Sequence, residues 1–205
     1  VIRCDAGGIG LFRSEFLYME NGAKPPTEEQ QFQAYKLAAE SMGSKKVVIR
    51  TADLGGDKVA ECLDLGEDAN PAIGYRGIRV SLDKEELFKT QLRAILRASA
   101  FGNLSIMFPM ITSIEEVTHA KVMLERAKRE LKDEKTSFDE EIPVGVMIET
   151  PAAVMISGEL AREVDFFSIG TNDLSQLTLG MDRQNGKIDK FYDPHHPALL
   201  KMIRI

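Results

Sequence analysis

The chain has 205 residues, of which 43% are hydrophobic, and this supplies the core of one domain, which we expect to cover residues 1–205. Its formal net charge of −6 at pH 7 argues against nucleic acid or an anionic membrane as the main partner, because both favour a basic surface. Charged residues interrupt residues 1–20, and no apolar run has the length of a membrane span, so we expect a cytoplasmic protein without membrane insertion. Cys4 and Cys62 fit no metal-ligand spacing and are expected to be reduced thiols.

The first predicted strand is GIGLF at residues 8–12. A helix is then predicted from a capping box that begins at Thr27 to a stop at Gly43, with an apolar pattern between them. The next apolar run is KVVIR at 46–50, which has the β-branched residues typical of a strand.

The middle of the chain continues to alternate between helix and strand. Asp83, with a glutamate three residues later, predicts the start of a helix that ends near Gly102. LSIMF at 104–108 predicts a strand, and Ser113 opens a further helix by the same capping pattern. The charge run KRELKDEK at 128–135 is interpreted as the solvated face of that helix.

Two more strands are predicted, VGVMI at 144–148 and DFFSIG at 165–170. Thr150 is expected to cap the helix that follows the first of them, and His195 and His196 to be loop and capping residues before a final helix. Apolar runs without alternation, interleaved with helices, predict parallel strands covered on both sides in an α/β fold. The first four predicted strands begin roughly 40 to 60 residues apart, so long loops are expected, as in a βα barrel.

Charged residues stand where several predicted strands end. Arg13 and Arg50 close two of them, Glu149 closes a third, and Thr-Asn-Asp at 171–173 follows a fourth. Each residue alone could be a helix cap or a structural ion pair. Together they are expected to converge at the carboxyl edge of a parallel sheet, which is where barrels and open α/β sheets bind ligands.

Four arginines lie in glycine-containing or apolar contexts rather than in lysine-rich helices, namely Arg13, Arg50, Arg76 and Arg183. The planar guanidinium binds carboxylate and phosphate groups through two hydrogen bonds and tolerates burial better than an ammonium group. This set of arginines therefore predicts a small polyanionic substrate.

Glu149 and Asp173 supply oxygen ligands from two strand ends, which suits Mg²⁺ or Mn²⁺ completed by substrate oxygens and water. A general acid/base pair is the competing interpretation. Lys58, in GGDK, is at best an additional cation over the site, because the nucleotide P-loop pattern is absent. Asn172 either caps the helix after 165–170 or holds a phosphate oxygen at its start.

Five blocks of the sequence resemble one enzyme family. They are GIGLFRSEFLYM at 8–19, RTADLGGDK at 50–58, NPAIGYRGIR at 70–79, VGVMIETPAAV at 144–154 and FFSIGTNDLSQLTLGMDR at 166–183. Their order and content resemble the phosphoenolpyruvate-binding domain of the Enzyme I family of bacterial sugar phosphotransferase systems. The wider group also contains pyruvate phosphate dikinase and phosphoenolpyruvate synthase, which remain alternatives on the same kind of site.

The resemblance implies a (β/α)₈ barrel that binds phosphoenolpyruvate or pyruvate and Mg²⁺ and forms a homodimer. It also implies a phosphotransferase that passes the phosphoryl group to a histidine of another domain and then to the carrier protein HPr during sugar uptake. Matched by position, the implied substrate-binding residues are Arg13, Arg50, Arg76, Asn172 and Arg183, and the implied magnesium ligands are Glu149 and Asp173.

Two functional features of the family have no counterpart here. The phosphoacceptor histidine segment is absent, and neither Cys4 nor Cys62 stands in the context of the catalytic cysteine. We therefore expect a fragment that carries about strands 2 to 6 of the barrel, has no catalytic residue of its own and is inactive alone in full transfer. Open barrel edges invite association, so a dimer is expected. A non-catalytic binding or dimerisation module is the remaining alternative.

Overall fold

The structure is a computed structural model that describes residues 5–21, 24–55, 63, 70 and 72–205. The prediction for Lys58 and the expectation for Cys4 and Cys62 fall outside the described residues. Within the described ranges, no helix is both long enough and apolar enough to cross a membrane.

Five parallel strands form one sheet, and their order across the sheet is their order along the chain. The strands are β1 (Ile9–Arg13), β2 (Val47–Arg50), β3 (Leu104–Phe108), β4 (Val144–Ile148) and β5 (Phe166–Ile169). All five strand predictions are confirmed to within one residue at each end.

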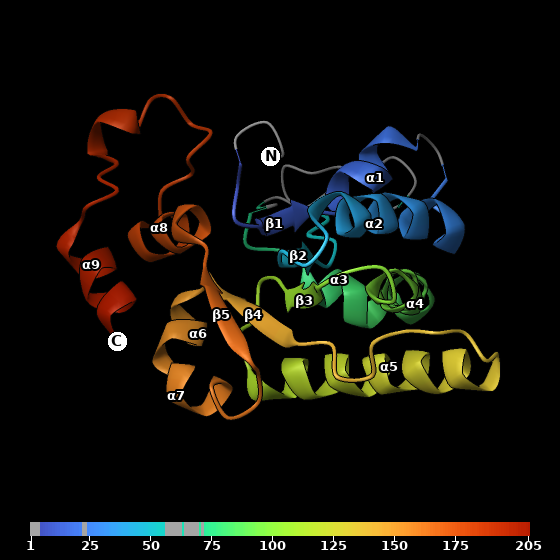
Figure 1. The fold of residues 1–205 in the computed structure, drawn as a ribbon. Helices are drawn as coiled ribbons and strands as arrows, with labels where there is room; N and C mark the ends of the chain where they lie inside the picture. The colour runs from blue at the N-terminus through green and yellow to red at the C-terminus, as the bar shows by residue number, and fades with distance from the viewer. Residues whose placement is uncertain (1–4, 22–23, 56–62, 64–69, 71) are drawn as a thin grey trace.

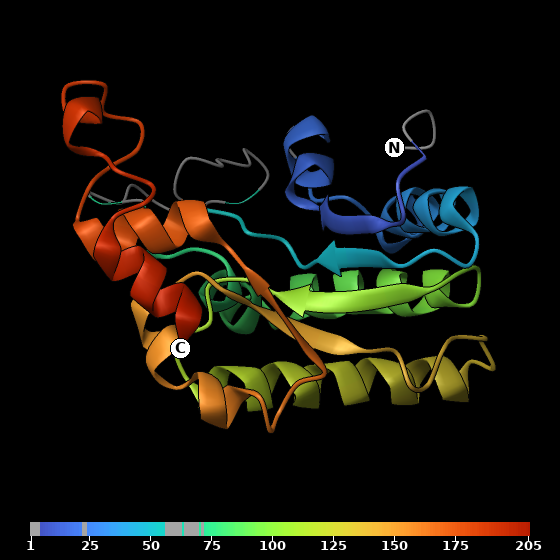
Figure 2. The same ribbon diagram turned by 60° about the vertical axis from the view of Figure 1, so that its left-hand side comes forward.

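Helices connect consecutive strands and cover the outer side of the sheet. α2, α4 and α5 lie side by side there, with α4 in contact with both of the others (Figure 1). The α-helices of the described chain are α1 (Glu15–Glu20), α2 (Glu28–Met42), α3 (Ile78–Asp83), α4 (Glu85–Ser99), α5 (Ile114–Asp133), α6 (Pro151–Met155), α7 (Ser157–Leu160), α8 (Thr171–Leu179) and α9 (Pro197–Arg204). The strand arrows point toward the side of the molecule where α8 lies (Figure 2).

Local side-chain contacts explain where four of the nine α-helices of the described residues begin. Thr27 and Ser113 each form the predicted capping box, Thr150 caps α6, and His196 accepts a hydrogen bond from the backbone of Ala198 at the start of α9. These predictions are confirmed.

The predicted cap at Asp83 is wrong. α4 begins at Glu85 after Lys84, and Asp83 is instead the last residue of α3, where its carboxylate accepts a hydrogen bond from the Tyr75 hydroxyl. The carboxylate is therefore committed to a tertiary contact, which local propensity does not reveal. Asn172 lies inside the first turn of α8, whose N-cap is Gly170, so it does not cap that helix.

Two parts of the core contain strand side chains and lie on opposite faces of the sheet, and a third is made of Tyr18, Ala52 and Leu54, which follow β1 and β2 in the chain. The larger part lies between the sheet and the outer helices, and β2, β3 and β4 are buried along their whole length. A smaller cluster of Val48, Met107 and Met147 lies on the inner face. Side chains that alternate between an inner cluster and an outer helical layer are characteristic of a βα barrel.

Among the described residues no further strand pairs with β1 or β5, which form the two open edges of the sheet. Leu11 on β1 and Phe167 and Ile169 on β5 are exposed apolar side chains, whereas the three central strands have none. Strands that are neighbours in the sheet are consecutive in the chain, and helices cover their outer side. This is the arrangement of a (β/α)₈-type barrel, of which five strands are present. The predicted incomplete barrel is confirmed, while the predicted homodimer stays a prediction.

Candidate functional site

The strand ends bring the predicted residues to one edge of the sheet. Arg13 and Arg50 are register partners at the ends of β1 and β2. Glu149 directly follows β4, and Asp173 lies in the first turn of α8, which follows β5. Because all strands run in the same direction, these residues share the carboxyl edge of the sheet, as expected.

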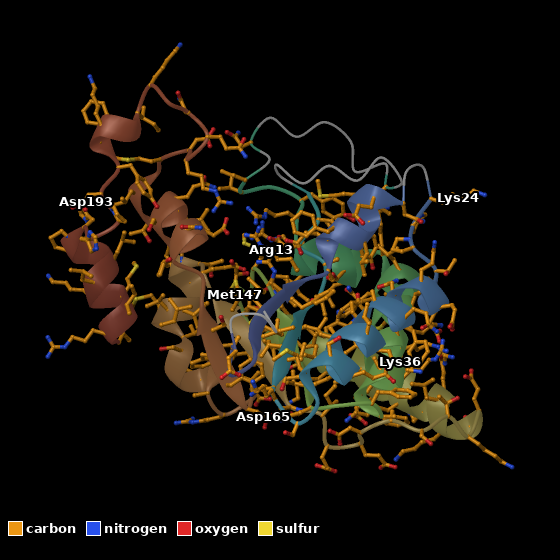
Figure 3. All side chains as sticks on the ribbon, turned by 45° about the horizontal axis from the view of Figure 1, so that its top comes forward. Arg13, Lys24, Lys36, Met147, Asp165 and Asp193 are labelled. Atoms are coloured by element: carbon orange, nitrogen blue, oxygen red, sulfur yellow. The ribbon has the colours of Figure 1, made fainter. Side chains whose placement is uncertain are left out.

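Arg50 is buried at 3% exposure and is held by two carboxylates. Its Nη2 atom lies 2.6 Å from Glu15 Oε1 and 3.4 Å from Asp53 Oδ2, and its Nη1 atom lies 3.6 Å from the Met147 sulfur. Arg13 and Met147 both lie in the central part of the view of Figure 3. The guanidinium therefore stands on the inner side of the sheet, between β1 and β4, with its orientation fixed by ion pairs.

Arg76 extends the charge cluster from the segment before α3. Its guanidinium donates to both oxygens of Asp53, at 3.3 and 2.9 Å, and its Nη1 atom lies 3.1 Å from Asp173 Oδ1. Arg183 reaches the other oxygen of Asp173 at 3.6 Å. The neighbouring Gly77 has φ +60°, and a Cβ there would lie 3.2 Å from Asp53, so a glycine lets this segment approach closely.

Glu149 is fully buried and less well neutralised. Its Oε1 atom accepts a hydrogen bond of 2.7 Å from the backbone N–H of Met110, and its Oε2 atom has no hydrogen-bond partner among the described residues. Burial raises the pKa of Glu149 to about 7, and the charges of Asp53 and Asp173 contribute to the rise. A Cβ on Gly170 would lie 2.8 Å from Oε2, so this glycine leaves room for the carboxylate.

The connected side chains form what we call the sheet-end cluster, made up of Glu15, Arg50, Asp53, Arg76, Glu149, Asp173 and Arg183. A buried carboxylate oxygen without a partner favours a cation beside it. The described residues contain no group of three or more His, Cys, Asp or Glu side chains that could hold a metal. Glu149 and Asp173 therefore suit a hard cation such as Mg²⁺ only if substrate oxygens complete its coordination.

The remaining predicted residues lie at the rim. Arg13 is exposed and has no ion pair or hydrogen bond with the described residues, so its guanidinium is available to a ligand. Asn172 is also exposed, next to Asp173 in the first turn of α8. The structure thus joins Arg50, Arg76, Arg183, Glu149 and Asp173, places Arg13 and Asn172 beside them, and leaves Lys58 undescribed.

Sequence analysis missed two members of the cluster, Glu15 and Asp53. Both are completely or almost completely buried, and each pairs with Arg50. A usable signal was present, because each acid stands two or three positions after an arginine that closes a strand. Arginines buried at a strand end need carboxylate partners, and the nearest acids in the sequence are the first candidates.

Comparison with known proteins identifies the family of the chain. The family model described as "PEP-utilising enzyme, PEP-binding domain" matches residues 1–205. The chain is 53% identical to phosphoenolpyruvate-protein phosphotransferase of Haemophilus influenzae over 98% of its length and 50% identical to that of Staphylococcus carnosus over all of it. The chain spans about a third of the length of these relatives, 35% in both cases.

One solved structure supports the fold alone. A citrate lyase from Burkholderia xenovorans matches 85% of this chain and 45% of its own, with a TM-score of 0.53 and 18% identity. At this identity the likeness carries no information about the ligand. The family match over the whole chain is decisive, and the chain belongs to the PEP-utilising enzymes, within their PEP-binding domain.

Proposed function

We propose that this chain binds phosphoenolpyruvate together with Mg²⁺ in a phosphotransferase that passes the phosphoryl group to a histidine and then to HPr in sugar uptake. The sheet-end cluster is the observation that carries this proposal. It gathers arginines and incompletely neutralised carboxylates at the carboxyl edge of a barrel-type sheet. Transfer of a phosphoryl group depends mainly on such positioning and electrostatics.

The arginines have two distinct roles in this proposal. Arg50 and Arg76 are already paired, so they present guanidinium groups in fixed orientations to an anion above the cluster. Arg13 is exposed and without a partner among the described residues, so it is free to bind the phosphate or carboxylate of phosphoenolpyruvate. Asn172 would donate its side-chain amide to a phosphate oxygen at the start of α8.

Glu149 and Asp173 would hold the Mg²⁺, or a Mn²⁺ in its place. When bound, the ion would stabilise negative charge on the phosphate and enolate oxygens. Glu149 Oε2 has no hydrogen bond to give up among the described residues, whereas both oxygens of Asp173 face arginines. We therefore expect Glu149 to be the principal ligand and Asp173 to exchange part of its pairing with Arg183.

The activity of the whole protein is proposed from its relatives. The curated relatives described above are named as phosphoenolpyruvate-protein phosphotransferases, and this favours that activity over a dikinase or a synthase. The histidine that accepts phosphate, the acid that protonates the enolate and the surface that binds HPr would lie outside this chain. The open sheet edges support a homodimer, and we place the protein in the cytoplasm.

Titration calorimetry with phosphoenolpyruvate in the presence of Mg²⁺ tests the proposal. Binding is expected for the wild type and should be lost in Arg50→Gln. Arg97→Gln is the matched control, because Arg97 is an ion-paired arginine on the outer helices and far from the strand ends. The proposal would be contradicted if the wild type shows no binding of phosphoenolpyruvate, or if Arg50→Gln and Arg97→Gln bind it with equal affinity.

A further inference from the structure

Gln91 is a buried glutamine of α4 whose side chain contacts the ends of two strands. Its Nε2 atom donates to the Ser14 hydroxyl at 2.9 Å and to the Tyr35 hydroxyl at 3.0 Å, and its Oε1 atom accepts from the backbone N–H of Ala52 at 2.9 Å. Both amide hydrogens and the carbonyl oxygen are thus used, with 1% of the residue exposed. An amide at this place acts as a bridge rather than as a surface group.

The groups that Gln91 holds are the immediate neighbours of proposed ligand-binding residues. Ser14 lies between Arg13 and Glu15, and its hydroxyl donates to the backbone carbonyl of Arg50 at 2.7 Å. Ala52 stands between Arg50 and Asp53. One side chain from the outer helical layer therefore joins the segment after β1 to the segment after β2.

We propose that Gln91 is a positioning residue for the phosphoenolpyruvate site, which sets the spacing between the segments that carry Arg13 and Arg50 without touching the substrate. This inference rests on the proposed function. The bridge needs two donors and one acceptor on one side chain, which glutamine supplies, whereas glutamate lacks the donors and methionine has no donor and only a weakly accepting sulfur.

Loss of the bridge should affect binding more than folding. Gln91→Met keeps nearly the same volume in the helix–sheet core but leaves the N–H of Ala52 and the hydroxyl of Tyr35 without their present partner. The two segments can then move apart to find other partners. Displaced arginines would make longer and weaker charge-assisted hydrogen bonds to the substrate, so we expect affinity for phosphoenolpyruvate to fall by about tenfold.

Gln31→Met is the matched control. Gln31 is a buried glutamine of α2 that accepts from the hydroxyls of Tyr18 and Tyr35 and donates to the carbonyl of Pro26, with no bond to a strand end. Both variants should lower the melting temperature, but only Gln91→Met should weaken binding of phosphoenolpyruvate with Mg²⁺ in calorimetry. Equal affinity in the two variants would overturn the inference.

Hydrogen exchange gives a readout that needs no ligand. The amide of Ala52 should lose protection in Gln91→Met and keep it in Gln31→Met, and unchanged protection in both would overturn the bridge. If the wild type fails to bind phosphoenolpyruvate, the proposed function fails while exchange still reports on Gln91. Ser14→Ala removes one arm of the bridge with less disturbance, and it should weaken binding if Gln91→Met does not fold; retained binding in Ser14→Ala would then overturn the inference.

Discussion

Asp53 and Glu28 each bridge two arginines, in opposite surroundings. Asp53 is fully buried in the sheet-end cluster and joins Arg50 and Arg76. Glu28, at the start of α2, joins Arg93 and Arg97 of α4 at 2.7 and 2.8 Å, on the outer helices. Both carboxylates are paired in the same way, but Asp53 is shielded from water and Glu28 is partly exposed to it.

The outer network is complete in itself. Arg93 also reaches Glu130 of α5 and Glu134, the C-cap of that helix, so that it links three helices, and the acids remain partly in water. In the sheet-end cluster, by contrast, Glu149 keeps an oxygen without a partner among the described residues. Charges that are buried at an energetic cost and left incompletely neutralised indicate a place for a ligand, whereas solvated ion pairs indicate surface cohesion.

The largest contrast should follow removal of the bridging charges. Asp53→Asn leaves two arginines buried with less compensation, and we expect a loss of about 3 kcal/mol in the free energy of unfolding, measured by urea denaturation. Glu28→Gln, the matched surface change, should cost less than about 1 kcal/mol. Similar losses in the two variants would remove the distinction between the regions.

The next largest difference between the two regions is expected in the affinity for a metal ion. Glu149→Gln keeps the shape of the side chain but removes its charge, so we expect Mn²⁺ to bind more weakly by about tenfold or more in the presence of phosphoenolpyruvate. Calorimetry or the spin resonance of Mn²⁺ measures this, with Glu28→Gln expected to match the wild type. If Glu149→Gln binds Mn²⁺ as tightly as the wild type does, Glu149 is not a ligand of the metal.

The two regions should also respond to pH with opposite sign. Burial raises the pKa of Glu149 to about 7 from a usual value of 4.5, so its ionisation lowers the free energy of unfolding as pH rises through that window. The hydrogen bond from Arg93 lowers the pKa of Glu134, and that contribution is present above 4.5 and is lost as pH falls below it.

Denaturation with EDTA present tests the first of these signs. The free energy of unfolding of the wild type should fall relative to that of Glu149→Gln between pH 4.5 and pH 7. The reason is that the Glu149 carboxyl ionises in this range, and the variant has no carboxyl at this position. A constant difference between the two proteins across this range would show that the pKa of Glu149 is not raised.

The smallest effect is expected in the outer network. Arg93→Gln should lower the free energy of unfolding by about 1 kcal/mol, and the difference from the wild type should shrink in high salt, because the acidic partners of Arg93 remain partly in water and their charges are screened. Binding of phosphoenolpyruvate should be unchanged in calorimetry. Weakened binding would mean that the helical layer transmits strain to the site through contacts other than Gln91.

The strands and several helix starts could be predicted from the sequence alone. Short apolar runs and capping boxes such as that of Thr27 are local, so they can be recognised from neighbours in the chain. The common direction of the strands then sent Arg13, Arg50 and Glu149 to one edge.

Which charges form pairs could not be predicted from the sequence, because it depends on how distant segments pack together. Arg76 pairs with Asp53 and Asp173, which are both far from it in the sequence. Gln91 lies on an outer helix, and its side chain bonds to the backbone that follows a strand. Asp83 had the pattern of a cap and yet pairs with Tyr75 instead. Pairing and burial depend on the distances that packing sets, and a local pattern carries no information about those distances.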